Sequence, residues 1–339
     1  MPSSISSFSL APGGSSVAAA EAPRPCDRYV KASVVSLICF GLLVGSLELG
    51  ARVAFDRVSH IGKRIAGEYS LAQSLTPDKP VPGRRRDSPS ILILGNSLLL
   101  MAVDLPALQQ KVAPNSVRVS RFVIESTAWL DWYYGIRRLL ANGSRPDVII
   151  LCLDARQLMS PSIRGDYSSY YLFQVRDILA VARATHSNLT QTSSLILAHY
   201  SRFYADRDNL RGFLLNRLDP EYMEMMQEVT VWGGALPSGA EIERTAEARL
   251  AALIEATAPF GVKSILLIPP GSIAGGKEIS TAATRVGAEV WVPIPQGTLP
   301  TADFQEDGYH LNQRGATIFT PALAGEMNRL AVSLIAPAK

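Results

Sequence analysis

Two short segments near opposite ends of the chain carry side chains that together could perform nucleophilic catalysis. Ser97 closes a Gly-Asn-Ser turn after the apolar run 91–94, and Asp307 stands three residues before His310. Serine is a weak nucleophile at its own pKa and needs a neighbouring base, while an imidazole base needs a carboxylate to fix its tautomer. The three residues are therefore candidates for an acyl-transfer site, provided that the fold brings them together.

Each segment also has a plain structural interpretation. A Gly-Asn-Ser turn can simply cap the helix that follows a strand, with Asn96 as the turn former. His310 alone can be a surface histidine, and Asp307 beside Gly308 can form a turn. The elements between the two segments decide whether the candidates can meet.

Apolar runs and helical patterns alternate along the second part of the chain. Runs with strand character cover residues 91–94, 117–124, 148–153, 264–268 and 289–292, and helical patterns cover 105–112, 129–141, 241–258 and 314–335. Continuous apolar runs are typical of strands buried on both faces, and their alternation with helices favours a parallel sheet. The pattern predicts a three-layer α/β/α sandwich with a five-stranded, mainly parallel sheet, and Ser97 at its carboxyl edge.

Taken together, the two segments resemble the first and last sequence blocks of the SGNH/GDSL hydrolase superfamily. Its members place a nucleophilic serine just after the first strand and Asp-x-x-His before the last helix. The resemblance covers about residues 89–335. It implies a flavodoxin-like (SGNH) fold, with Ser97 as nucleophile, His310 as general base and Asp307 orienting the histidine, and a reaction that needs neither a metal nor an organic cofactor.

The superfamily also implies an oxyanion hole made by the serine N–H, a glycine N–H in a second block and an asparagine side chain in a third. Here Ser126 lies where the glycine would be and Asp154 where the asparagine often is. An ionised carboxylate would repel the oxyanion. Either the N–H of Ser126 still donates, or Arg156 replaces the asparagine, or the site is impaired; loss of one donor costs about 10²- to 10³-fold in rate. Asn96 is a further local candidate.

The N-terminal part of the chain has a different composition. We expect a disordered tail over 1–31, a transmembrane signal anchor over 32–55, a juxtamembrane linker over 56–88 and the hydrolase domain over 89–339. Residues 32–51 contain one charge, Glu48, and as a helix span about 30 Å, the thickness of bilayer hydrocarbon. A cleaved signal peptide is disfavoured by this length, and a core helix by the missing amphipathic face. Charges on the two sides do not decide the orientation.

A segment of about eighty residues, roughly 160–237, interrupts the alternation of strands and helices. It is rich in Tyr, Phe and Arg and has helical patches. Because it follows the third strand, it should lie on the face where open α/β sheets bind ligands. It is either a cap over a substrate cleft or a helical excursion that serves packing or membrane contact.

Composition excludes several other classes of protein. Thirty-three Lys and Arg against thirty Asp and Glu leave a net charge of +3, which is too small to favour nucleic acid as a partner. The three cysteines form no CxxC or Cys/His pattern, so neither a disulfide framework nor a zinc site is indicated. The cysteine content fits both a cytosolic protein and a bacterial envelope protein.

A single-pass anchor joined to such a domain is similar to bacterial proteins that assist O-acetylation of cell-surface polysaccharides beside a multispanning acyltransferase. The resemblance implies a membrane-anchored serine esterase or O-acyltransferase with its catalytic domain outside the cytoplasmic membrane. Its expected partners are a carbohydrate or other small acyl ester, most simply an acetyl ester, the lipid bilayer and a multispanning acyltransferase. The alternative, suggested by the missing glycine and asparagine, is a non-catalytic domain that binds glycan or scaffolds a membrane complex.

Overall fold

The computed structural model of the 339-residue chain describes residues 25–57, 59–76, 88–115, 117–218, 236–271 and 275–335. Most of the predicted tail and residues 77–87 of the predicted linker lie outside the described residues. The chain divides into an N-terminal unit that ends at Leu47 and a larger unit, Glu48–Lys339.

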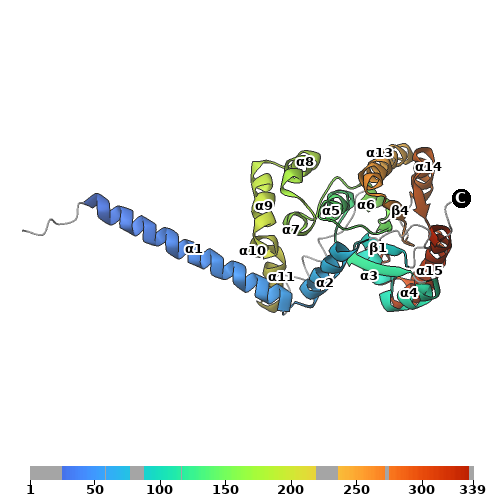
Figure 1. The fold of residues 1–339 in the computed structure, drawn as a ribbon, viewed down its shortest axis with the longest axis horizontal. Helices are drawn as coiled ribbons and strands as arrows, with labels where there is room; N and C mark the ends of the chain where they lie inside the picture. Colours follow the sequence, from blue (N-terminus) through green and yellow to red (C-terminus); the bar gives the residue numbers. More distant parts are fainter. Residues whose placement is uncertain are drawn as a thin grey trace, which may run out of the picture. The chain divides into compact units, whose positions relative to one another are not determined.

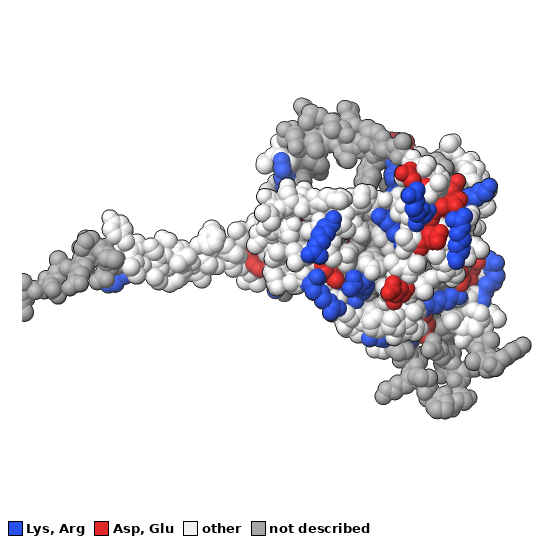
Figure 2. Space-filling model, turned by 90° about the horizontal axis from the view of Figure 1, so that it is seen from above, with Lys and Arg blue, Asp and Glu red and all other residues white. Residues whose placement is uncertain are grey.

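The described part of the N-terminal unit belongs to helix α1 (Pro25–Arg57), which begins inside the predicted tail and continues past the end of the unit. Its stretch Tyr29–Phe55 is long and apolar enough to cross a membrane, with a mean hydropathy of 2.0 and 6% of the apolar window buried. No charged residue occurs between Lys31 and Glu48, and Figure 2 draws the middle of this helix in white. Because a core helix would be mostly buried, the apolar surface is typical of a membrane anchor or a signal sequence.

The larger unit contains the five-stranded parallel sheet that the sequence predicts. Its strands are β1 (Ser90–Gly95), β2 (Arg118–Val123), β3 (Val148–Cys152), β4 (Lys263–Leu267) and β5 (Glu289–Trp291), in the order β2-β1-β3-β4-β5. From β1 the chain adds β2 on one side and then crosses back to add β3 on the other. In open α/β sheets, ligands bind beyond the carboxyl ends of the strands at such a reversal, which lies here between β1 and β3.

Helices cover both faces of the sheet, which confirms the three-layer sandwich (Figure 1). Side chains of β1 alternate between the two layers: Leu92 and Leu94 belong to one apolar core, Ile91 and Ile93 to the other. The first core lies under α5 (Trp129–Ala141), α13 (Gly239–Thr257) and α14 (Gly276–Val286), and the second under α4 (Leu105–Val112) and α15 (Gln313–Ile335). Short 3₁₀ helices cover Ala113–Asn115, Val175–Asp177, Ala258–Phe260 and Thr301–Asp303.

Helix α2 (His60–Ser74) lies within the segment expected to be a linker, and it packs against the domain. Its residues Ile65 and Ala72 are buried in the first core. On the same helix, Glu68 accepts a hydrogen bond from the Val123 N–H (2.8 Å), and Arg64 donates to the Val123 carbonyl (3.0 Å). Since β2 is an edge strand, these side chains occupy backbone groups that would otherwise offer an open edge.

The described part of the insertion is helical, as its helical patches predict. Helix α6 (Ala155–Met159) leads into it, and the insertion comprises α7 (Asp166–Tyr171), α8 (Ile178–Ala184), α9 (Leu189–Tyr200), α10 (Arg202–Ala205) and α11 (Arg207–Leu218). Two side chains of α5 tie it to the domain. Asp131 accepts a hydrogen bond from the Arg164 N–H (3.1 Å), and Arg138 donates to the carbonyls of Tyr170 (2.6 Å) and Phe173 (2.9 Å).

Candidate active site

Ser97 is the first residue of helix α3 (Ser97–Ala102), directly after β1. Asn96 caps this helix and is fully buried: its Oδ1 accepts from the Leu98 N–H (3.0 Å), and its Nδ2 donates to the Thr127 carbonyl (2.9 Å). A Cβ atom on Gly95 would lie 3.0 Å from the Cys152 carbonyl oxygen, so the turn needs glycine there. Asn96 therefore acts as a cap and as a link between two loops.

Asp307 and His310 lie on a tight loop that leads into α15. The loop is closed by the His310 carbonyl, which accepts from the Gln305 N–H (2.7 Å), and it turns at Gly308 with a φ of +63°. Asp307 Oδ1 accepts from the backbone N–H groups of Tyr309 (2.9 Å) and His310 (3.0 Å). The carboxylate of Asp307 is thus fixed by its own loop, independently of its contact with the imidazole.

The structure brings Ser97, His310 and Asp307 into one hydrogen-bonded chain. His310 Nε2 lies 2.8 Å from Ser97 Oγ, although the two residues are 213 positions apart, and His310 Nδ1 lies 2.6 Å from Asp307 Oδ2. In the tautomer with the proton on Nδ1, the imidazole donates to Asp307 and accepts from the serine hydroxyl. The side chains of His310 and Asp307 are 22% and 45% exposed, so an ester can reach them from solvent.

Hydrogen bonds keep the carboxylate of Asp307 ionised. Burial acts to raise the pKa of Asp307, but hydrogen bonds from the His310 ring and from the backbone N–H groups of His310 and Tyr309 outweigh it and hold the pKa below its usual value. A charged Asp307 is what an imidazolium at His310 needs when the serine proton arrives.

Asp154, a candidate for the surroundings of the oxyanion, fixes the loop that carries the histidine. Its carboxylate caps α6 by accepting from the Gln157 N–H (2.7 Å) and also accepts from the Tyr309 hydroxyl (2.7 Å). Gln157 Nε2 donates to that same hydroxyl (3.0 Å). Burial raises the pKa of Asp154, with hydrogen bonds and nearby Arg156 opposing the rise. Sequence reasoning missed Tyr309 and Gln157, although the Asp-x-x-Gln spacing is typical of a capping box.

Ser126 lies on the turn between β2 and α5. Its φ of +59° is in the left-handed region that favours glycine, the residue that the superfamily pattern has at this point. Thr127 fixes the turn: its hydroxyl donates to the Ile124 carbonyl (2.6 Å) and accepts from Trp132 Nε1 (2.8 Å). A serine here costs about 1 kcal/mol or more of strain, which the surrounding hydrogen bonds must offset.

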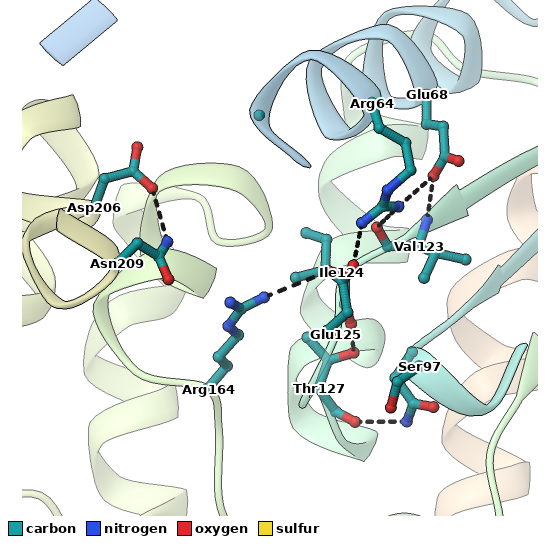
Figure 3. Close-up of polar contacts among 12 residues, drawn as sticks. Arg64, Glu68, Ser97, Val123, Ile124, Glu125, Thr127, Arg164, Asp206 and Asn209 are labelled. Carbon is teal, nitrogen blue, oxygen red and sulfur yellow. Dashed lines mark hydrogen bonds and ion pairs between the residues drawn. The ribbon is translucent and has the colours of Figure 1, made fainter. Parts of the chain in front are cut away.

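A network of charges borders this turn (Figure 3). Glu125 forms an ion pair with Arg64 of α2 and lies 4.0 Å from Arg164 at the start of the insertion. Glu68 joins the network through Arg64 (3.2 Å) and Arg121 (3.0 Å). Three parts of the chain therefore meet next to the Ser126 turn. Among the described residues, no group of three or more His, Cys, Asp or Glu side chains could hold a metal ion.

Comparisons with known proteins give likenesses to solved structures alone. No family model and no curated protein matches the sequence. TesA is 14% identical with a TM-score of 0.35, and the match covers 71% of this chain and 99% of TesA. A carbohydrate esterase family 3 from Talaromyces cellulolyticus is 11% identical with a TM-score of 0.37, covering 72% of this chain and 99% of the esterase.

A GDSL-like lipase from Bacteroides thetaiotaomicron is also similar, with 12% identity and a TM-score of 0.36 over 79% of this chain and 97% of the lipase. Likenesses at these identities and scores decide neither the family nor the activity of this chain. The case for a function therefore rests on the geometry of Ser97, His310 and Asp307.

Proposed function

We propose that the protein is a serine esterase or O-acyltransferase of the SGNH/GDSL type. The observation that carries the proposal is the contact of His310 Nε2 with Ser97 Oγ at 2.8 Å, backed by the 2.6 Å contact of His310 Nδ1 with Asp307. These distances are within the reach that a general base needs for proton transfer. A non-catalytic scaffold would have no use for this alignment at the carboxyl edge of the sheet.

In the first step Ser97 Oγ attacks the carbonyl carbon of an ester while His310 Nε2 takes the hydroxyl proton. Asp307 stabilises the resulting imidazolium. When the tetrahedral intermediate collapses, the bond to the alcohol oxygen breaks and His310 gives its proton to that oxygen. The products are a free alcohol and an acyl group on Ser97.

In the second step the acyl group leaves Ser97 by the reverse chemistry. His310 takes a proton from water or from a sugar hydroxyl, the resulting oxygen nucleophile attacks the acyl carbonyl, and Ser97 recovers its proton from the imidazolium. Water yields an acid and a sugar hydroxyl yields a new ester. Neither route requires a metal or an organic cofactor.

For the oxyanion we propose the N–H groups of Ser97 and Ser126 as donors, with Arg156 adding positive charge. Ser97 opens α3, and Ser126 has the backbone conformation that a glycine would adopt. Arg156→Ala is then expected to lower kcat, and to do so by a larger factor than it raises KM. An unchanged kcat in steady-state kinetics would exclude Arg156 as a donor.

We also propose that α1 anchors the protein in the cytoplasmic membrane, with the domain on the outer, periplasmic side. The exposed apolar stretch Tyr29–Phe55 supports a membrane location. A polysaccharide ester, most simply an acetyl ester, is the proposed substrate, and a multispanning acyltransferase the proposed partner. Both follow from the resemblance to envelope proteins of polysaccharide O-acetylation. A membrane-impermeant maleimide tests the orientation. In intact cells it should label the variant Thr317→Cys.

Turnover of p-nitrophenyl acetate by the full chain in detergent tests the chemistry. The wild type should release p-nitrophenol, and the acyl group should pass partly to an added oligosaccharide if the protein is a transferase. Ser97→Ala removes only the hydroxyl oxygen of this side chain. The variant should fold like the wild type and lose this turnover. Equal turnover in both proteins would reject the serine mechanism, and no turnover in folded wild type with any acetyl ester would favour the glycan-binding scaffold.

A further inference from the structure

A pocket of about 430 Å³ lies on the larger unit, remote in sequence from the catalytic loops. Its walls come from the last turns of α1, from α2, α5 and α7, and from the α9–α10 junction. They carry three arginines, Arg52, Arg138 and Arg202, together with His199 and four tyrosines, of which Tyr200 is the most exposed. Ser97, His310 and Asp307 do not line this pocket.

The charges around the pocket favour an anionic ligand. Arg52 Nε contacts Glu48 at 2.9 Å, and Arg202 forms an ion pair with Asp206. Arg138 donates instead to backbone carbonyls of α7 and the residues after it. The walls therefore carry three guanidinium groups, and no Asp or Glu is among the described residues that line them. Guanidinium groups bind phosphate oxygens through paired, directed hydrogen bonds, and tyrosine hydroxyls can add further donors.

Glu48, in the part of the apolar stretch that belongs to the larger unit, connects this stretch to the pocket walls. The 27-residue stretch Tyr29–Phe55 is about 40 Å long, close to a bilayer with its headgroups, and Glu48 lies seven residues, or about 10 Å, from its end. Glu48 accepts hydrogen bonds from Ser201 Oγ (2.9 Å), Arg202 N–H (2.9 Å) and Phe203 N–H (3.1 Å). Within the larger unit, the end of this apolar stretch is therefore tied to the α9–α10 junction.

Helix α9 presents apolar side chains to solvent next to this junction. Leu197 is 53% exposed and Tyr200, which lines the pocket, is 65% exposed. They are three residues apart and so share one face of the helix, with Ile196 beside them. Exposed leucine and isoleucine are costly in water, whereas tyrosine is enriched at membrane interfaces, where its ring is apolar and its hydroxyl is hydrated.

We propose that this pocket binds the anionic headgroup of a phospholipid, while Ile196, Leu197 and Tyr200 of α9 enter the membrane interface. The proposal rests on the membrane anchoring proposed above and is independent of the ester chemistry. It identifies the insertion as a second membrane contact. The domain is then held against the bilayer at two places, in contrast to a domain that hangs from one flexible tether.

The membrane contact of α9 is tested with the full chain in nanodiscs of phosphatidylcholine and phosphatidylglycerol. Cys26 and Cys39 are replaced by serine, and Cys152 is kept because it is buried. One fluorophore is then attached to a single new cysteine. The three variants are Leu197→Cys, Thr317→Cys at an exposed position of α15, and Leu42→Cys in the apolar stretch. Aqueous iodide should quench the label at 317 and lose its effect at 197 and 42. Quenching at 197 as strong as at 317, with 42 still protected, would overturn the inference and leave the anchor intact. Quenching at all three positions would overturn both.

The headgroup is tested by native mass spectrometry of the full chain released from the same nanodiscs. Wild type should retain phosphatidylglycerol in preference to phosphatidylcholine. Arg52→Gln, an exposed change, should reduce this retention about fivefold, the factor that corresponds to about 1 kcal/mol for one arginine near anionic lipid. Equal retention of both lipids by wild type, or release of phosphatidylglycerol by equimolar inorganic phosphate, would reject a lipid headgroup as the ligand.

Discussion

The sheet with its triad and the helical insertion are stabilised by different kinds of interaction. Strands β1 and β3 at the centre of the sheet are buried along their whole length, and the triad lies on turns at its carboxyl edge. In the insertion, Arg202 and Asp206 form a buried ion pair under the rings of neighbouring tyrosines, and Arg207 pairs with Asp166. Burial of apolar area fixes the sheet without requiring any one partner, whereas the insertion adds specific charged pairs to its share of the apolar core.

The largest effect on activity is expected when His310, at the edge of the sheet, is replaced. The same replacement of His186, in the insertion, serves as the comparison. His310→Asn should lower kcat/KM for p-nitrophenyl acetate by roughly 10⁴- to 10⁶-fold, because the general base is lost. The matched control is His186→Asn, an exposed loop position with a φ of +54° that asparagine tolerates. Steady-state kinetics should place it at the wild-type value. Comparable losses in both variants would mean that the assay reports folding.

Breaking the ion pair of the insertion should affect that region and spare the sheet. Arg202→Met leaves Asp206 buried without its guanidinium, which costs about 3 to 5 kcal/mol. Hydrogen exchange should therefore speed up in α7, α9 and α10 while β1 and β3 keep their protection. Replacing both partners, Arg202→Met with Asp206→Leu, should recover much of the protection. If β1 and β3 lose protection in the single variant, the two regions unfold together and the comparison fails.

Asp131 lies where α5 of the sandwich meets the insertion, and it should make the stability of the protein depend on pH. Burial raises the pKa of Asp131 to about 6, above its unfolded value of about 3.9. The folded state then binds more protons between these two values, so the free energy of unfolding should fall by about 3 kcal/mol as pH rises through that window. Urea unfolding at pH 4 and pH 7 measures this. In Asp131→Asn this fall in the free energy of unfolding between pH 4 and pH 7 should vanish. An unaltered pH dependence would show that Asp131 is not its source.

The smallest effect is expected from the tether of the catalytic loop. Tyr309→Phe removes the hydroxyl that joins Asp154 and Gln157, hydrogen bonds worth about 1 kcal/mol each. Because the hydroxyl positions His310 without touching substrate, kcat should fall about tenfold while KM stays the same. A raised KM at constant kcat would place Tyr309 in substrate binding instead.

The sequence predicts the parts of the molecule that follow apolar periodicity. The helices over 105–112 and 129–141 and all five strands occur where the pattern places them, because each buries a continuous stripe or face. Helix α14 was missed, since it buries only small side chains and one isoleucine, Ile279. The packing of α2 was also missed, because its contacts with Val123 are made by Arg64 and Glu68, charged residues that are typical of a solvated linker.

The meeting of Ser97 with His310 could be predicted because parallel strands bring their carboxyl ends to one edge. The role of Asp154 could not, because its partner Tyr309 is 155 residues away and no local pattern links them. Sequence spacing reports which residues share an element. Which side chain of one loop reaches a hydroxyl of another depends on the packing of the whole domain.

The central claim is that Ser97 is a nucleophile activated by His310, and covalent labelling with a fluorophosphonate tests it most directly. The probe phosphonylates an activated serine and releases fluoride, and the labelled peptide can be identified by mass spectrometry. The full-length wild type should carry the label on Ser97, with His310→Asn labelled far more slowly and Ser97→Ala unlabelled. A folded wild type that stays unlabelled, or a label on any other residue, would contradict the claim.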